Sequence, residues 1–244
     1  MRCNVKKIKK DLKNNGYSYL PNILKYNENF KNLNKEIIIF LNSLIKKKYN
    51  NINQFDKNIC LKFKKNKNIS ALLNDNLNLL PSLKGIFADQ KIIKLIKDLM
   101  SAKKKPLIYN NPRLRVQIPG HDKVSNLPWH KDIHYNKIKR SNSLVFWISL
   151  GKIDKDMGPV LIKSNSHKIK NVKKTFFKKA NGSKVPSVDI KNINKKYNKD
   201  ISFTTKPGDV LIFDLNLIHK SGNNKSFNKV KWSAQARYHV PYFN

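Results

Sequence analysis

A histidine and an aspartate lie two positions apart in the segment PWHKDIHY, residues 128–135, which follows a predicted strand. Alternate side chains of a β-strand point to the same face, so His130 and Asp132 would direct an imidazole and a carboxylate at one point. Lys131 would face the other side. Two histidines and one carboxylate, with coordination positions left open, suit Fe(II). The pattern therefore predicts two thirds of a metal site and requires a second histidine from elsewhere in the chain.

The run PGDVLIFDLNLIHKSGNN, residues 207–224, supplies that histidine. Its apolar centre predicts a buried strand, and His219 comes at the end of this strand, before Ser221 and a glycine. A β-barrel would bring this strand end close to the earlier pair. We therefore predict His130, Asp132 and His219 as the metal-binding and catalytic residues.

The last predicted strand, KWSAQARYHV, adds a candidate anion anchor. Lys231 and Ser233 share one face with Arg237, and a cation two residues from a hydroxyl can hold a carboxylate by charge-assisted hydrogen bonds. Lys231 and Arg237 are six residues apart, roughly 20 Å along a strand, so both cannot hold one small diacid. We favour Lys231, which should lie nearer His219, and keep Arg237 as the alternative anchor.

The remaining sequence indicates how these residues are positioned. Residues 1–105 have apolar residues at mostly helical spacing, whereas residues 106–244 contain many short strands without helices between them, which is typical of a sandwich or barrel. Residues 168–199 hold 11 lysines and one acidic residue and are predicted to form a long loop or irregular insertion. We expect one structural domain, with the helical segment packed on the core.

The composition excludes several classes of protein. Two cysteines cannot form a disulfide framework, no signal peptide is evident, and no apolar run could span a bilayer, so we predict a cytoplasmic protein. The net charge of +36 comes mostly from lysines scattered along the chain together with many Asn and Ile residues. AT-rich codons would produce this composition without selection for binding. A nucleic-acid partner is therefore not expected, and the oligomeric state is not predicted.

These motifs, in this order, resemble the phytanoyl-CoA dioxygenase family of Fe(II)/2-oxoglutarate-dependent oxygenases. The resemblance rests on LRVQIPG, PWHKDIHY, SNSLVFWISL, DMGPVLIKSNSHK, GDVLIFD, IHKSGNN and KWSAQARYHV. It implies a mainly β fold with flanking helices, namely a double-stranded β-helix of the jelly-roll or cupin type. It also implies Fe(II), 2-oxoglutarate and O2 as cofactor and co-substrates, with iron bound by the three predicted ligands. By position, Gln117, Trp147 and Ser221 resemble residues that line the 2-oxoglutarate pocket.

One departure from the family concerns the anchor, because the family usually has arginine where this chain has Lys231. Lysine keeps the charge but lacks the planar fork that binds a carboxylate through two parallel bonds. Arg115 shares a strand face with Gln117 and could line the substrate pocket or pair with an acid. We predict a dioxygenase that hydroxylates a small metabolite. The basic segment 168–199 would favour a metabolite that carries a negative charge. The alternative is a non-catalytic or degenerate basic jelly roll that binds nucleic acid or an acidic polymer.

Overall fold

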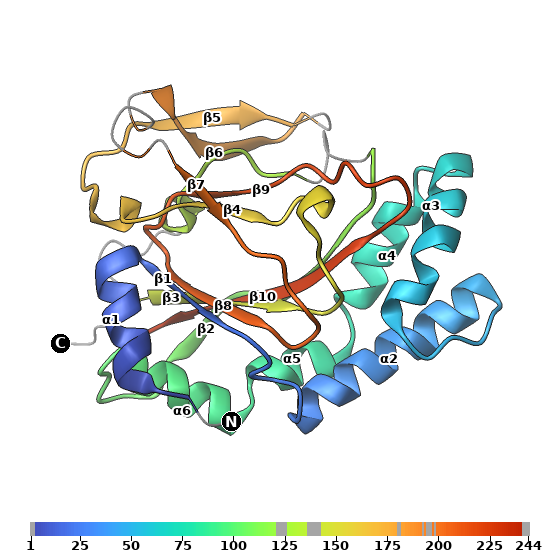
Figure 1. Ribbon diagram of the computed structural model, residues 1–244, viewed down its shortest axis with the longest axis horizontal. Helices are drawn as coiled ribbons and strands as arrows, with labels where there is room; N and C mark the ends of the chain where they lie inside the picture. Colours follow the sequence, from blue (N-terminus) through green and yellow to red (C-terminus); the bar gives the residue numbers. More distant parts are fainter. Residues whose placement is uncertain are drawn as a thin grey trace.

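Two antiparallel sheets form the centre of the computed structural model, which describes residues 3–120, 126–135, 143–179, 182–191, 193, 197 and 199–240. The larger sheet has the order β1-β8-β3-β10-β2, and the smaller sheet has the order β7-β4-β9. The larger sheet consists of β1 (Tyr17–Leu20), β8 (Val210–Asp214), β3 (Ser143–Ser149), β10 (Lys231–His239) and β2 (Leu107–Gln117). The smaller sheet consists of β7 (Asp200–Ser202), β4 (Val160–Lys163) and β9 (His219–Ser221). Figure 1 shows the smaller sheet above the larger one.

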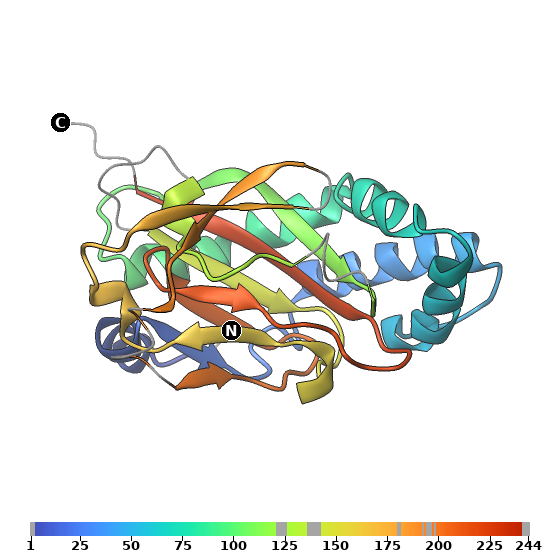
Figure 2. The same cartoon turned by 90° about the horizontal axis from the view of Figure 1, so that it is seen from above.

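Six helices in the N-terminal part of the described chain cover the outer face of the larger sheet. They are α1 (Val5–Asn15), α2 (Glu28–Ile45), α3 (Asp56–Lys65), α4 (Ile69–Leu77), α5 (Pro81–Phe87) and α6 (Gln90–Leu99). Their apolar faces join one hydrophobic cluster with Phe146 and Ile148 of β3, while the alternate residues Val145 and Trp147 join a second cluster that faces the smaller sheet. Figures 1 and 2 place α2 to α4 toward one end of the molecule. The strand alternation therefore assigns one face to the helices and the other to the interior between the sheets.

The N-terminal segment also supplies an edge strand of the larger sheet. Helix α1 ends at Gly16, whose φ of +85° is in the left-handed region that glycine adopts without strain. A Cβ at this position would lie 2.5 Å from Nδ1 of His167 and 2.7 Å from a methyl carbon of Leu217. The chain then enters β1, which pairs with β8 in the register Tyr17 to Phe213. The first 105 residues are thus mostly helical, as predicted, but they also complete the sheet.

Asparagine side chains of α4 and of its C-cap residue, Asn78, cover the outer edge of β2. Asn78 donates a hydrogen bond to the carbonyl of Leu114 at 3.0 Å and accepts one from its amide at 2.8 Å, as a neighbouring strand would. Asn74 accepts a further bond from the amide of Val116 at 3.3 Å. Backbone groups at a buried sheet edge need such partners. Helix α4 therefore takes the place of a sixth strand at this edge.

The prediction of a loop or irregular insertion over residues 168–199 is wrong for part of that segment. Strands β5 (Lys174–Lys178) and β6 (Lys184–Val188) form a hairpin, seen above the smaller sheet in Figure 1. The amide of Val188 donates to the carbonyl of Trp129 at 2.9 Å, and the Tyr135 hydroxyl donates to the carbonyl of Pro186 at 3.2 Å. The hairpin thus packs on the segment that carries His130 and Asp132. Its many lysines hid this strand pattern, because they mask the alternation of the apolar residues.

Short 3-10 helices complete the described elements: η1 (Ile52–Phe55), η2 (Asp132–Tyr135), η3 (Lys155–Met157) and η4 (Ser166–Lys168). Among the residues that the structure describes, none of the helices combines the length and the apolar character needed to cross a membrane.

Candidate functional site

The two predicted histidine ligands are joined through their backbones. His130 and His219 form an antiparallel bridge, in which each amide donates to the other residue's carbonyl, at 3.0 and 3.1 Å. Residues directly opposite each other in such a pair project their side chains to the same side. The two imidazole rings accordingly lie with their centroids 4.2 Å apart. Residues 89 positions apart in the sequence are thus held together before any ligand binds.

Asp132 completes the cluster, although not on the strand that its spacing predicted. Only His130 pairs as a β-residue, and Asp132 begins the 3-10 helix η2. The carboxylate still returns to the imidazoles: its Oδ1 lies 3.4 Å from Nε2 of His130 and 4.0 Å from Nε2 of His219. The three candidate ligand atoms lie within 4.8 Å of one another, and all three residues are buried. This arrangement could hold one metal ion.

The hydrogen bonds of the histidines suit metal binding. Nδ1 of His130 lies 2.7 Å from the carbonyl of Pro128, and Nδ1 of His219 lies 2.9 Å from the carbonyl of Leu217. A carbonyl only accepts hydrogen bonds, so each Nδ1 carries a hydrogen, and each Nε2 is the ring nitrogen on the side of Asp132. Burial, together with the neighbouring His130, lowers the pKa of His219 to about 3, so its ring is neutral at pH 7. Two imidazoles and a carboxylate form a donor set that fits Fe(II).

Arg237 holds the Asp132 carboxylate from the other side. Its Nε donates to Oδ2 at 2.7 Å and its second terminal nitrogen donates to Oδ1 at 2.9 Å, so the planar fork binds both oxygens. Burial alone would raise the pKa of Asp132, but the charge of Arg237 holds it well below its usual range. The sequence predicted Arg237 only as an alternative anchor for the co-substrate. Its position on the same strand face as Lys231 was the available signal that it points into the interior.

A narrow cavity of about 40 Å³ lies beside the two histidines. Four of the five residues predicted to bind the co-substrate line it: Trp147, Ser221, Lys231 and Ser233. The ammonium of Lys231 donates to the carbonyl of Gly158 at 2.5 Å. Gln117, the fifth predicted residue, is not part of this lining. Its amide donates to the carbonyl of Gly222 at 3.0 Å and to Asn126, so it supports the loop that follows His219 and Ser221.

The family model described as Phytanoyl-CoA dioxygenase (PhyH) matches residues 16–229, which is most of the chain. The chain belongs to the phytanoyl-CoA dioxygenase family. A curated relative, the peroxisomal phytanoyl-CoA dioxygenase of Bos taurus, is 30% identical over 105 residues. This match spans 43% of the present chain but only 31% of the bovine protein, about a third of its length.

Solved structures with similar folds include iron and 2-oxoglutarate enzymes. The epimerase SnoN, solved with Fe3+, α-ketoglutarate and nogalamycin RO, has a TM-score of 0.65 at 13% identity, covering 96% of this chain and 83% of its own. EctD from S. alaskensis, solved with bound Fe, has a TM-score of 0.62 at 16% identity, covering 98% and 77%. The carbocyclase SnoK has a TM-score of 0.57 at 14% identity, covering 96% and 83%. At such low identity these similarities show the fold, and they confirm the predicted double-stranded β-helix with flanking helices.

In this member of the phytanoyl-CoA dioxygenase family, the cation at the start of the last strand is the lysine Lys231. Lys231 pairs in register with Gln117 of β2, and Ser233 pairs with Ser149 of β3. The alternation predicted for the last strand is thus present, and Lys231 and Ser233 face the cavity while Trp232 is fully buried in the helix-facing cluster. The observed geometry places Lys231 next to the histidines' cavity and Arg237 on Asp132.

Proposed function

We propose that this protein is an Fe(II)- and 2-oxoglutarate-dependent dioxygenase that hydroxylates a small molecule. The observation that carries the proposal is the buried cluster in which Nε2 of His130 and Nε2 of His219 both face Oδ1 of Asp132. Membership in the phytanoyl-CoA dioxygenase family supports the same class of enzyme. The reaction itself is a proposal, since the proteins with similar folds also include an epimerase and a carbocyclase.

Each residue has a definite part in this proposal. His130, Asp132 and His219 hold Fe(II), and Arg237 fixes the orientation of the Asp132 carboxylate by binding both of its oxygens. Bound Fe(II), together with 2-oxoglutarate, supplies the chemistry that activates O2 and oxidises the substrate. Because the aspartate occupies the position that a halide would need on the metal, we favour hydroxylation over halogenation.

Lys231 and Ser233 bind the far carboxylate of 2-oxoglutarate, with Ser221 and Trp147 beside it. The ammonium of Lys231 exchanges its bond to the carbonyl of Gly158 for one to the carboxylate, which is a stronger, charge-assisted hydrogen bond. The cavity of about 40 Å³ that these side chains line is the place of the far carboxylate in this proposal. Their buried surroundings then exclude water from the bound co-substrate.

The proposal is tested by iron binding and by release of succinate from 2-oxoglutarate. We expect the purified protein to bind about one Fe(II) and to form succinate only when iron, 2-oxoglutarate and O2 are all present. The variants His130→Ala and His219→Ala should lose both properties. His239→Ala is the matched control, because His239 lies at the end of β10 beside Ser143, outside the cluster.

Undiminished iron binding in both ligand variants would refute the metal site. A wild-type protein that binds iron but never releases succinate would favour the degenerate jelly roll instead.

The cytoplasmic location stays a prediction, since the name of the bovine relative places that protein in peroxisomes.

A further inference from the structure

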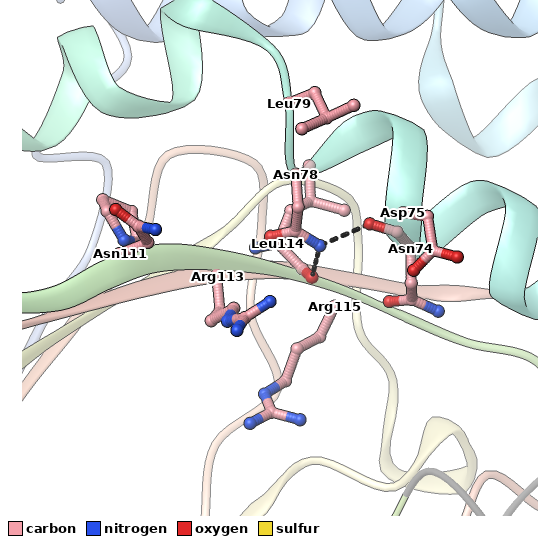
Figure 3. A pocket seen from close by; sticks show the side chains of 9 residues that line it. Asn74, Asp75, Asn78, Leu79, Asn111, Arg113, Leu114 and Arg115 are labelled. Carbon is pink, nitrogen blue, oxygen red and sulfur yellow. Dashed lines mark hydrogen bonds between the residues drawn. The ribbon is translucent and has the colours of Figure 1, made fainter.

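Two arginines of β2, one of which lines the cavity beside the histidines, have no part in the proposed function so far. Arg113 and Arg115 lie two positions apart on β2, and in the sheet register they face Gln235 and Ser233 of β10. Residues opposite each other in a sheet share a face, so both arginines lie on the interior face that carries Lys231 and Ser233. Figure 3 shows both guanidinium groups on the same side of β2.

Arg115 connects the cavity beside the histidines with a larger cleft. It lines the narrow cavity together with His130 and His219. It also lines a cleft of about 620 Å³ at the edge of β2, which is large enough for a metabolite. The cleft is lined by Asn74, Asp75, Asn78, Leu79, Asn111, Pro112, Arg113, Leu114 and Arg115. A molecule in this cleft would therefore contact Arg113 and Arg115 and reach toward the metal ligands.

Among the described residues around Arg113 and Arg115 the positive charges outnumber the negative ones, although Asp132 attracts Arg115. Arg237 is paired with Asp132, but none of the described carboxylates forms an ion pair with Arg113 or Arg115. Lys179, at the end of β5, is close enough to Arg115 for the two positive charges to repel. Burial, reinforced by repulsion from Arg237, lowers the pKa of Arg115.

The one carboxylate in the cleft lining is poorly placed to neutralise them. Asp75 is exposed on α4, and Figure 3 shows it on the opposite side of β2 from the two guanidinium groups. An exposed arginine is commonly just solvated, and Arg113 alone would carry no inference. Arg115 is different, because it is half-buried beside two further cations. Like charges held together away from water favour binding of an anion.

We propose that Arg113 and Arg115 form an oxyanion-binding site, so that the substrate is a small molecule carrying a carboxylate or phosphate group. The planar guanidinium forks match the oxygen geometry of either group. The anionic end of the substrate occupies the cleft at the edge of β2, and the remainder extends past Arg115 toward His130 and His219. This inference rests on the proposed function, which supplies the reaction at the metal site.

The site is tested with sulfate, a doubly charged oxyanion that stands in for a phosphate ester. The full-length protein is loaded with Fe(II) and 2-oxoglutarate without oxygen, and sulfate binding is measured calorimetrically at constant ionic strength. The double variant Arg113→Gln/Arg115→Gln should bind sulfate at least about tenfold more weakly than wild type, because it loses both charged donors. The matched control is Lys62→Gln/Lys65→Gln, which removes the same charge from two exposed positions on α3 and should change binding less than about twofold.

Equal weakening in the two double variants would overturn the site, as would the absence of saturable sulfate binding by wild type. If the double variant does not fold, Arg113→Gln alone decides the question, since Arg113 is exposed and its replacement disturbs no packing. That single variant should bind sulfate at least about threefold more weakly, and wild-type binding by it would refute the proposal.

Failure of this inference can be told apart from failure of the proposed function. The visible absorption of the Fe(II) complex with 2-oxoglutarate is recorded in the same titration. A wild-type protein that forms this complex but binds no sulfate refutes only the oxyanion site, whereas absence of the complex refutes the proposed function. Metabolites are then compared in pairs, one with a carboxylate or phosphate and one with the corresponding amide or alcohol. Only the charged members should stimulate succinate release, and equal stimulation by the neutral members would overturn the substrate class.

Discussion

Lys231 offers the sharpest test of how the co-substrate is held. Its side chain is 4% exposed, and its ammonium lies 2.5 Å from the carbonyl of Gly158, at the edge of the cavity beside the histidines. Lys231→Met keeps an unbranched side chain of similar length but removes the charge. The substitution therefore leaves little new empty space and acts mainly on the binding of an anion.

The expected effect follows from the strength of one charge-assisted hydrogen bond. Such a bond contributes about 1.5 to 3 kcal/mol, and 1.4 kcal/mol corresponds to a factor of ten in affinity. Lys231→Met should thus weaken 2-oxoglutarate binding by about 10- to 150-fold. Lys231→Arg introduces the fork that the family usually has at this place and should bind 2-oxoglutarate at least as well as wild type.

The assay is an anaerobic titration of the Fe(II)-loaded protein with 2-oxoglutarate, followed by visible absorption, with iron content measured in parallel. Arg237→Gln is the comparison, because Arg237 is already bound to Asp132 through both oxygens. Wild-type affinity in Lys231→Met would refute the assignment. A larger loss of 2-oxoglutarate affinity in Arg237→Gln, at unchanged iron content, would show that Arg237 is the anchor.

Three further predictions concern stability. Burial raises the pKa of Asp56 to about 6, so its contribution to stability is present at low pH and is lost as the pH rises through 6. Between pH 4 and pH 7 the free energy of unfolding of Asp56→Asn, measured in urea, should therefore fall by about 2 kcal/mol less than that of wild type, and parallel pH profiles would refute this. Asn78→Ala should cost about 2 to 4 kcal/mol, because it leaves the amide and carbonyl of Leu114 without their partner, and a change in thermal midpoint below about 2 °C would contradict it. Arg237→Gln should cost the metal-free protein about 3 kcal/mol or more, and Fe(II) should restore part of that stability by neutralising Asp132; a melting temperature that iron does not raise would count against this account.

The chemistry of the site was largely predictable from residue types and spacing. A histidine and an aspartate two positions apart, and a second histidine after an apolar strand, indicate a metal site from short stretches of sequence alone. The alternation on the last strand correctly separated Lys231 and Ser233, which line the cavity, from Trp232, which packs among the helices. Their roles in iron and co-substrate binding remain predictions.

Other features depend on tertiary structure that no local pattern encodes. Asp132 begins a 3-10 helix because the chain leaves the bridge at His130 and turns, which i and i+2 spacing cannot reveal. The pairing of Arg237 with Asp132 joins strand β10 to the 3-10 helix η2 across 105 positions of the sequence. The asparagines that cover β2 lie in α4 and at its C-cap, where asparagine is ordinary, so their role could not be inferred from propensity.

The pairing of β1 with β8 constrains how the chain can reach its native state. Strand β1 ends at residue 20, and its partner begins at residue 210, so this edge of the sheet cannot form until the chain has been synthesised beyond residue 210. The helices that follow β1 are synthesised first, and their apolar faces stay exposed until β3, β8 and β10 cover them. Contacts so distant in sequence slow folding and prolong exposure of aggregation-prone segments. Expression of residues 106–244 alone would therefore remove β1 and leave the larger sheet without one of its edge strands.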